Sequence, residues 1–263
     1  MAEDVTGLQL ELREEGHAVH VVFERPGVLN ALAPGDLPRL AAALREAGSQ
    51  PGVRVVVVRG AGGAFSAGDD LKATAGLDAA GWRAVVEGFH DLTRAACALD
   101  VPVICAIDGV CIGGAFEFAC SCDLRIATTR SRFGCPEVRL GLTISNAASV
   151  LLAQLCGAGY AAELMLTGRL IGAEEAHARG LVNKVVGPAE LDREVGELAE
   201  EIAQRAPLAV RATKRLLVDG QAEALEQAMA RETTAAVSLV PTSDLEEGLR
   251  AFREKRPPSF SGS

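Results

Sequence analysis

Short apolar runs with strand character alternate with stretches of helical periodicity through the first half of the chain. Two of the runs, residues 53–58 and 101–107, are rich enough in apolar side chains for strands buried on both faces. Arg25-Pro26-Gly27 ends an earlier run. The segments predicted to be strands are residues 8–13, 18–23, 53–58, 101–107, 124–127 and 181–186.

Helical patterns separate these strands and take over in the C-terminal half. Asp36 is expected to cap a helix that runs through Arg45 and stops at Gly48. The helices predicted beyond residue 146 are residues 146–156, 173–179, 188–205, 207–219, 221–238 and 244–255. The alternation predicts an α/β fold with crossover helices. Because no linker interrupts the pattern, we expect a core over residues 1–200 extended by a helical region over 201–263.

The composition indicates a globular protein and argues against general polyanion binding, while a local basic patch for a phosphorylated ligand stays open. Of 263 residues, 49% are hydrophobic and only 4% aromatic, so the predicted core is packed with Ala, Val and Leu rather than with rings. The formal charge of -9, from 26 basic and 35 acidic residues, argues against a nucleic-acid partner.

The cysteines and the N-terminus favour a cytoplasmic protein. Seven cysteines, an odd number, lie mostly in apolar runs, which favours reduced and buried thiols. Cys120-Ser121-Cys122 has no second ligand pair, so no metal is expected. Met1-Ala2-Glu3-Asp4 resembles neither a signal nor a transit peptide, and no uncharged apolar stretch is long enough for a membrane span.

Two glutamates in apolar, Gly-flanked surroundings are the candidates for chemistry. Glu117 follows Gly113-Gly114 and lies between two phenylalanines, and Glu137 follows Cys135-Pro136. A carboxylate is costly to bury unless it is paired, neutralised or used. Two such groups brought together push their pKa values apart and can act as an acid and a base. A solvated or capping role, with Glu117 complementing the positive end of a helix, explains the local sequence equally well.

Glycine-containing turns follow the three strongest strands, over residues 64–71, 108–115 and 133–141. Ligands settle at the carboxyl ends of strands in α/β sheets. Gly113-Gly114 at the start of a helix would expose N–H donors. One of these paired with an N–H of the Ala67-Gly68 turn would make an oxyanion hole, although close helix packing also accounts for the glycines.

Other common chemistries lack their motifs. The chain has neither a phosphate loop nor a dinucleotide fingerprint. Serine and cysteine nucleophiles are disfavoured because no histidine has an evident partner or a nucleophile-elbow context. The residues considered were Ser66, Ser121, Cys135, His17, His20, His90 and His177.

Motifs along nearly the whole chain resemble the enoyl-CoA hydratase/isomerase (crotonase) superfamily. Each is weak alone, but eight in the right order are highly specific. The matching segments are Glu24-Arg25-Pro26 with Leu29-Asn30-Ala31-Leu32, Ala64-Phe65-Ser66-Ala67-Gly68 with Asp70-Leu71-Lys72, Asp108-Gly109 through Gly113-Gly114 and Glu117, Cys122-Asp123-Leu124-Arg125, Phe133-Gly134-Cys135-Pro136-Glu137 to Leu140-Gly141, Ala173-Glu174-Glu175-Ala176 with Gly180-Leu181-Val182, Thr213-Lys214, and Phe252-Arg253-Glu254-Lys255-Arg256.

The resemblance implies a spiral of ββα units with a helical C-terminal region that drives trimerisation, commonly to a dimer of trimers. It implies an acyl-CoA thioester substrate, with coenzyme A as part of the substrate and no separate cofactor. Backbone N–H groups of Ala67 and Gly114 would hold the thioester oxygen. Glu117 and Glu137 fall on the positions of the two catalytic glutamates of hydratases, which add water reversibly to a 2-enoyl-CoA.

The resemblance also implies a set of substrate contacts. Phe252 and Lys255 are expected to reach the ligand across a subunit boundary, while a solvated surface role stays open for Arg25 and Lys72. The implied substrate-binding residues are Arg25, Gly68, Asp69, Asp70, Leu71, Lys72, Gly113, Phe252 and Lys255.

One departure from the family pattern leaves the reaction open. Residues 142–149 read Leu-Thr-Ile-Ser-Asn-Ala-Ala-Ser where the family has a Pro-Gly-rich turn, so Ser145 or Asn146 is expected to cap the next helix. An enoyl-CoA isomerase, or another crotonase-fold acyl-CoA lyase or hydrolase, is the first alternative. A non-catalytic binding protein is the remote one, because a few relatives bind RNA.

Overall fold

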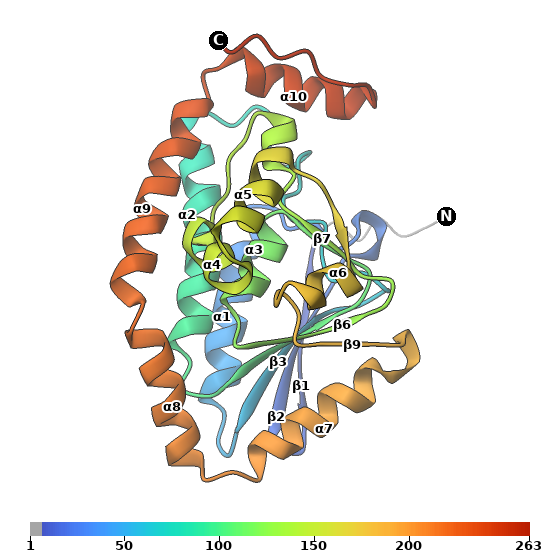
Figure 1. The fold of residues 1–263 in the computed structure, drawn as a ribbon, viewed down its shortest axis with the longest axis vertical. Coiled ribbons are helices and arrows are strands. Elements are labelled where there is room, and N and C mark those ends of the chain that lie inside the picture. The colour runs from blue at the N-terminus through green and yellow to red at the C-terminus, as the bar shows by residue number, and fades with distance from the viewer. Residues whose placement is uncertain (1–6) are drawn as a thin grey trace.

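A six-stranded sheet lies at the centre of the computed structural model, which describes residues 7–263 (Figure 1). Strands β1 and β2 pair antiparallel, and all other neighbours in the sheet are parallel. The predicted α/β arrangement is therefore present. In sheet order the strands are β1 (Gln9–Glu15), β2 (Ala18–Glu24), β3 (Val55–Gly60), β4 (Val103–Ile107), β6 (Leu124–Thr128) and β9 (Lys184–Val186).

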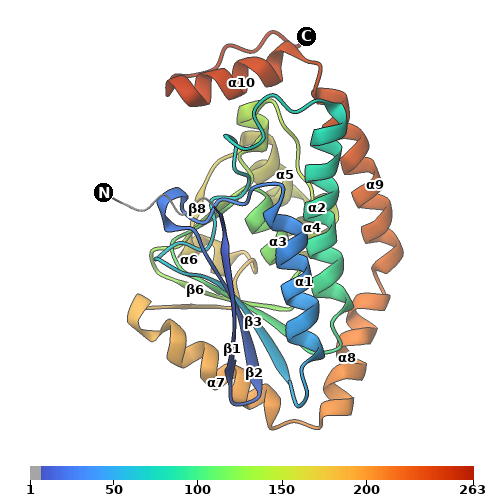
Figure 2. The ribbon, with the colours of Figure 1, turned by 180° about the vertical axis from the view of Figure 1, so that it is seen from behind.

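Helices cover both faces of this sheet. Helices α1 (Asp36–Ser49) and α2 (Ala79–Ala98) lie on one face, and α7 (Leu191–Ala203) packs on the other (Figure 2). Alternate residues of β3 enter the two cores, with Val56 facing the first and Val55 the second. The β-branched runs predicted to be buried on both faces are buried in that way.

A second, three-stranded sheet was not predicted from the sequence. It consists of β5 (Val110–Ile112), β7 (Arg132–Gly134) and β8 (Ile171–Gly172). Strands of two or three residues are too short to show a period of two. The small sheet matters because it leads directly into the segments that hold the two glutamates, and the N–H of Gly113 donates to the carbonyl of Gly134 (2.9 Å).

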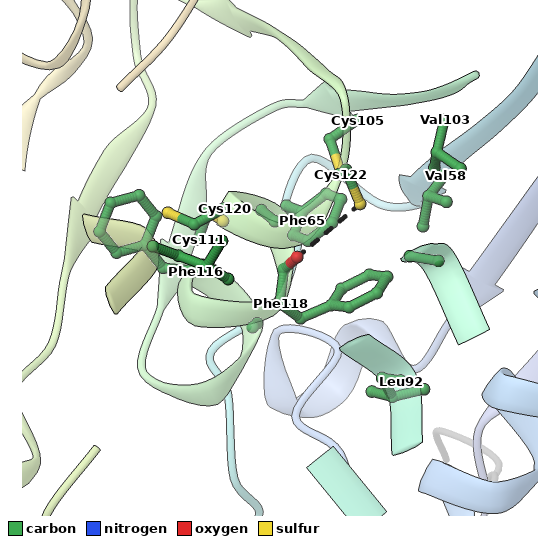
Figure 3. Packing of buried hydrophobic residues seen from close by; sticks show 14 of the residues in the cluster. Val58, Phe65, Leu92, Val103, Cys105, Cys111, Phe116, Phe118, Cys120 and Cys122 are labelled. Atoms are coloured by element: carbon green, nitrogen blue, oxygen red, sulfur yellow. Dashed lines mark hydrogen bonds between the residues drawn. The ribbon is translucent and has the colours of Figure 1, made fainter. Parts of the chain in front are cut away.

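Helix α3 (Gly114–Ser121) is buried among aromatic side chains and thiols (Figure 3). Phe116 and Phe118 are almost fully enclosed, and the thiol of Cys122 donates to the carbonyl of Phe118 (3.7 Å). All seven cysteines are unpaired, as the sequence predicted. Burial raises the pKa of Cys120 to about 12, so this thiol stays protonated.

The C-terminal half is helical, as predicted. Helix α9 (Ala222–Leu239) runs beside α2, and α10 (Ser243–Glu254) lies across the short 3₁₀ helix η2 (Glu137–Leu140) (Figures 1 and 2). Helix α5 was missed, and the helix predicted from residue 188 begins as a 3₁₀ turn. The remaining helices are α4 (Ala148–Cys156), α5 (Ala158–Thr167), α6 (Ala173–Ala178) and α8 (Pro207–Asp219).

Both predicted helix caps are wrong. Gly35 is the N-cap of α1, and the carboxylate of Asp36 instead accepts the N–H of Ala33 (3.0 Å), which lies before the helix. Ala147 is the N-cap of α4, and the side chains of Ser145 and Asn146 bind Glu117, Gly114 and Thr93 instead. The carboxylate of Glu232 in α9 accepts the N–H groups at the start of α4, and local sequence does not show such a contact.

Along residues 7–263 we find no helix with both the length and the apolar character needed to cross a membrane.

Lys214 fastens α8 to the central sheet. Its side chain is 4% exposed, and Nζ lies 2.9 Å from the carboxylate of Asp123. Nζ also donates to the carbonyl oxygens of Ala96 (3.2 Å) and Val101 (2.8 Å). One cation thus satisfies a carboxylate and two backbone groups between α2 and β4. Its removal takes this donor from two carbonyl oxygens and leaves Oδ2 of Asp123 with the N–H of Val103 (2.7 Å).

We predict that Lys214→Met lowers the free energy of unfolding by about 3 kcal/mol, because it removes a buried cation and its bonds to a carboxylate and two carbonyl oxygens. Urea denaturation measures the loss. Lys184→Met is the matched control, since Lys184 pairs with Glu194 while 55% exposed and should cost less than about 1 kcal/mol. Equal losses in the two variants would contradict the assignment.

Candidate active site

Glu117 is buried in the first turn of α3 with one oxygen bound and one free. The side chain is 1% exposed. Its Oε2 accepts two hydrogen bonds from Ser145, one from the N–H (2.9 Å) and one from the hydroxyl (2.7 Å). Among residues 7–263 no group donates to Oε1. The carboxyl group is therefore fixed at one oxygen and open at the other.

Glu137 is the first residue of η2 and is 8% exposed. Its Oε2 also has no hydrogen-bond partner in the described part of the chain. The other oxygen lies against Gly113, where φ is +59° and a Cβ atom would come within 3.0 Å of Oε1. Glycine at position 113 thus meets two demands, since it permits the positive φ and the close approach of the carboxyl group.

The two glutamates come together, as the sequence indicated. One carboxylate oxygen of each and the thiol sulfur of Cys135 all lie within 4.8 Å of one another. Burial of both side chains contradicts the solvated alternative. The pair stands at the point where α3 and η2 leave the small sheet.

Burial raises the pKa values of both carboxyl groups. The pKa of Glu117 lies well above its usual range because of burial and then of the charge of Glu137, and the hydrogen bonds from Ser145 oppose the shift. Burial raises the pKa of Glu137 to about 8. Near neutral pH the pair therefore holds at least one proton, and can supply an acid and a base side by side.

The turn after β3 packs directly on the start of α3. Gly68 has φ +81°, and a Cβ atom there would lie 2.6 Å from the carbonyl oxygen of Ile112. The N–H of Ala67 donates to the carbonyl of Leu29 (2.9 Å), and the N–H of Gly68 donates to the hydroxyl of Ser66 (3.0 Å). This contradicts the prediction that Ala67 offers its N–H to a ligand, because that donor is already used.

The N–H groups of Asp69 and Gly114 are the candidates for ligand donors instead. Between residues 7 and 263 neither N–H donates to a backbone carbonyl. The half-buried carboxyl group of Asp69 faces both N–H groups, and burial raises its pKa to about 6 although these donors oppose the shift. The sequence placed the first donor two residues too early, because the direction of an N–H in a turn depends on φ and ψ.

Arg25 and Asp70 bind each other rather than face a ligand. Nη1 of Arg25 lies 2.8 Å from Oδ2 of Asp70, and both side chains are largely buried. The other oxygen of Asp70 accepts the N–H groups of Lys72 (3.0 Å) and Ala73 (3.2 Å). These contacts hold the loop before α1 onto the turn that carries Asp69.

A cavity of about 550 Å³ lies beside this turn. Its lining combines three cations and one carboxylate with apolar side chains, so it suits a ligand with anionic and apolar parts. Phe252 and Lys255 line it together with Lys72 of the same chain, so their predicted approach across a subunit boundary is not required. The lining residues are Leu71, Lys72, Ala75, Gly76, Glu246, Leu249, Phe252, Arg253 and Lys255.

Cys135, Glu117 and Glu137 form the one group of donors, within residues 7–263, close enough to hold a metal ion. A thiolate and two carboxylates suit a zinc-like cation. Burial raises the pKa of the Cys135 thiol well above its usual range, as it does for both glutamates, so a cation would have to displace protons. The expectation that no metal takes part stays a prediction.

Ser145 is the site residue whose role the sequence did not reveal. The unusual reading of residues 142–149 drew attention to the segment, but the predicted role was a helix cap. The observed partner, Glu117, lies 28 residues away in the sequence. No local pattern encodes a pairing of that kind.

Comparison with known proteins places these features in a family. The family model described as "Enoyl-CoA hydratase/isomerase" matches residues 13–263. Crotonyl-CoA hydratase of Syntrophomonas wolfei is 36% identical over 94% of this chain and 95% of its own. Short-chain-enoyl-CoA hydratase of Clostridium acetobutylicum is also 36% identical, over 93% and 94%.

A solved structure shows the same fold. The enoyl-CoA hydratase from Mycobacterium avium subsp. paratuberculosis superposes with a TM-score of 0.87 at 28% identity, covering 96% of this chain and 98% of that one. The predicted crotonase-like α/β class is confirmed. A role of the C-terminal helices in trimerisation stays a prediction.

We predict that Glu137→Gln stabilises the protein at alkaline pH. A carboxyl group whose folded pKa is raised binds more protons folded than unfolded, so its contribution to stability falls as pH rises toward the folded value of about 8. The glutamine cannot ionise. The advantage over wild type should be small at pH 5 and on the order of 5 kcal/mol at pH 9.

Urea denaturation at a series of pH values measures this difference. Glu46→Gln, an exposed carboxyl group on α1, is the control and should show no such trend. If the stability difference between Glu137→Gln and the wild type did not change with pH, ionisation of Glu137 would cost the folded protein no stability, and the prediction would be wrong.

Proposed function

The chain belongs to the enoyl-CoA hydratase/isomerase family, and from that premise we propose that it adds water reversibly to the 2,3 double bond of a 2-enoyl-CoA thioester. The product is a 3-hydroxyacyl-CoA. The observation that supports this reaction best is the pair of buried carboxyl groups, each with an unpartnered oxygen and with one oxygen of each within 4.8 Å, beside two N–H groups that donate to no backbone carbonyl in residues 7–263.

The N–H groups of Asp69 and Gly114 are proposed to hold the thioester oxygen. Attack of water on C3 of a conjugated thioester moves negative charge onto that oxygen, so donors fixed in advance lower the barrier. The start of α3 adds the positive end of a helix dipole at Gly114. Substrate binding requires the carboxyl group of Asp69 to leave the two donors that it faces in the free protein.

The two glutamates divide the proton transfers. Glu117, whose charged form the hydrogen bonds from Ser145 stabilise, takes a proton from water as the water oxygen bonds to C3. Glu137, protonated near neutral pH, gives a proton to C2 as the enolate collapses. Glu117 must lie within hydrogen-bond reach of the water, and the acidic proton of Glu137 must reach C2. Each proton transfer contributes about 10²- to 10⁴-fold to the rate.

The cavity beside α10 is the proposed site for the coenzyme A part of the substrate. Lys72, Arg253 and Lys255 bring positive charge for its phosphates, and Phe252 offers an apolar surface. Arg25 is not part of this proposal because its charge is paired with Asp70. The names of the relatives from S. wolfei and C. acetobutylicum support a short acyl chain.

Hydration is favoured over isomerisation by the second carboxyl group. Family members that only move a double bond often manage with one carboxylate, whereas both are present and buried here. Assembly as a homotrimer or a dimer of trimers and a cytoplasmic location stay predictions.

We predict that the purified protein removes the ultraviolet absorbance of the conjugated double bond of crotonyl-CoA. Glu117→Gln and Glu137→Gln should each lower kcat by at least about 100-fold, because each removes one proton carrier. Glu46→Gln on the surface of α1 should keep the wild-type rate.

A wild type without hydration across short and medium enoyl chains would overturn the proposed reaction. Full activity of Glu137→Gln would leave hydration in place but show that the two-carboxyl mechanism is wrong.

A further inference from the structure

We propose that Ser145 is a positioning residue for Glu117: it fixes one carboxylate oxygen and leaves Oε1 as the oxygen that acts on water. The inference rests on the proposed hydration, since it assigns a role within the same site. It concerns the segment of residues 142–149, where the chain departs from the Pro-Gly-rich turn of the family.

Two donors of one residue converge on one oxygen. The N–H and the hydroxyl of Ser145 lie 2.9 Å and 2.7 Å from Oε2 of Glu117, and the serine is 7% exposed. A half-turn of the carboxyl group only exchanges two equivalent oxygens, whereas any smaller rotation breaks both bonds from Ser145. The arrangement therefore allows one orientation of the carboxyl plane, in which one oxygen is bound by Ser145 and the other has no partner within residues 7–263.

Asn146 determines where the serine hydroxyl points. Its side-chain amide donates to the hydroxyl oxygen of Ser145 (3.2 Å), so the hydroxyl proton is directed to Glu117. The same amide nitrogen donates to the carbonyl of Gly114 (3.1 Å), whose N–H is one of the two candidate donors. One amide thus ties the proposed base to the proposed oxyanion hole.

Helix α2 holds Asn146 in a left-handed conformation. Its φ is +58°, its Oδ1 accepts the hydroxyl of Thr93 (2.9 Å), and its N–H lies 3.1 Å from Nδ1 of His90. Burial lowers the pKa of His90 to about 4, so the ring is neutral and Nδ1 accepts. Nε2 then carries the proton, which it donates to the hydroxyl of Thr233 (3.1 Å).

Helix α9 fixes the other end of the turn. The carboxylate of Glu232 accepts the N–H groups of Ala147 (2.8 Å) and Ser149 (3.0 Å), and the hydroxyl of Ser149 (2.6 Å). These bonds cap α4 from outside its own sequence. Contacts from α2 and α9 therefore hold the turn on both sides, which is what a rigid support for Glu117 requires.

Within residues 7–263, the charged groups that shift the pKa of Glu117 include no cation. The titratable groups around it are Glu137 of η2, with Asp69 beyond it, Glu232 of α9, the thiols of Cys120 and Cys135, and neutral His90 through Asn146. All of these are neutral or negative. The two donors of Ser145 are thus the contacts that favour the carboxylate form a base needs.

Ser145→Ala tests the proposal. We expect kcat to fall about 10- to 100-fold with KM changed little, because a hydrogen bond to a charged group is lost while substrate contacts remain. The acidic limb of the kcat–pH profile should move to higher pH by about one unit, since the charged form of Glu117 loses a donor. Ser145→Thr, which keeps the hydroxyl, should restore both.

Ser149→Ala is the matched control within the same turn. It also removes a serine hydroxyl bound to a carboxylate, but that carboxylate, Glu232, only caps α4. We expect lower thermal stability and an unchanged acidic limb. An acidic limb of Ser145→Ala at the wild-type position, or an equal shift in Ser149→Ala, would reduce Ser145 to a structural role and overturn the proposal.

A second measurement separates this inference from the proposed reaction. Carbon-13 NMR of the labelled Glu117 carboxyl group follows its titration without any substrate. The proposal requires the midpoint to rise in Ser145→Ala, even if the wild type does not hydrate crotonyl-CoA. An unchanged midpoint in Ser145→Ala contradicts the positioning role. A raised midpoint in Ser145→Ala, together with a wild type that does not hydrate crotonyl-CoA, contradicts only the proposed reaction.

Discussion

The structure depends on two carboxyl groups buried side by side with no cation beside them in the described chain. Glu117 and Glu137 are 1% and 8% exposed, and each keeps one oxygen without a partner. Two adjacent charges in such a place repel each other and lose their hydration, so a proton must stay with the pair. That shared proton allows an acid and a base to coexist at neutral pH. The surrounding elements have to keep the two carboxyl groups buried and close together.

Rigid elements from distant parts of the chain meet that demand. The three-stranded sheet brings the starts of α3 and η2 together, and glycine at position 113 lets the carboxyl group of Glu137 approach the backbone. Helices α2 and α9 clamp the turn that carries Ser145. The small sheet, Gly113 and the contacts from α2 and α9 bring no positive charge to the pair. They act through hydrogen-bond dipoles and close packing, which stabilise a developing charge without neutralising Glu117 as a base.

Lys214 shows how the same fold treats a buried charge that has no chemical task. It is as enclosed as the glutamates, yet a carboxylate and two carbonyl oxygens surround it. Arg25 and Asp70 neutralise each other in a similar way. Charges that serve the fold are paired, whereas the two carboxyl groups of the site are left incomplete. This contrast separates structural from functional groups more clearly than burial alone.

Sequence alone determined the strands of the main sheet, most of the helices, the two glutamates and the glycine turns beside them. These follow from local periodicity and from residue types whose backbone or charge limits their surroundings. Tertiary structure alone decided that Asp69 rather than Ala67 offers its N–H, that Glu232 rather than Ser145 caps α4, and that Ser145 holds Glu117. Each of these depends on the direction of a single N–H or hydroxyl and on a partner far away in the sequence, and neither leaves a periodic trace in the chain.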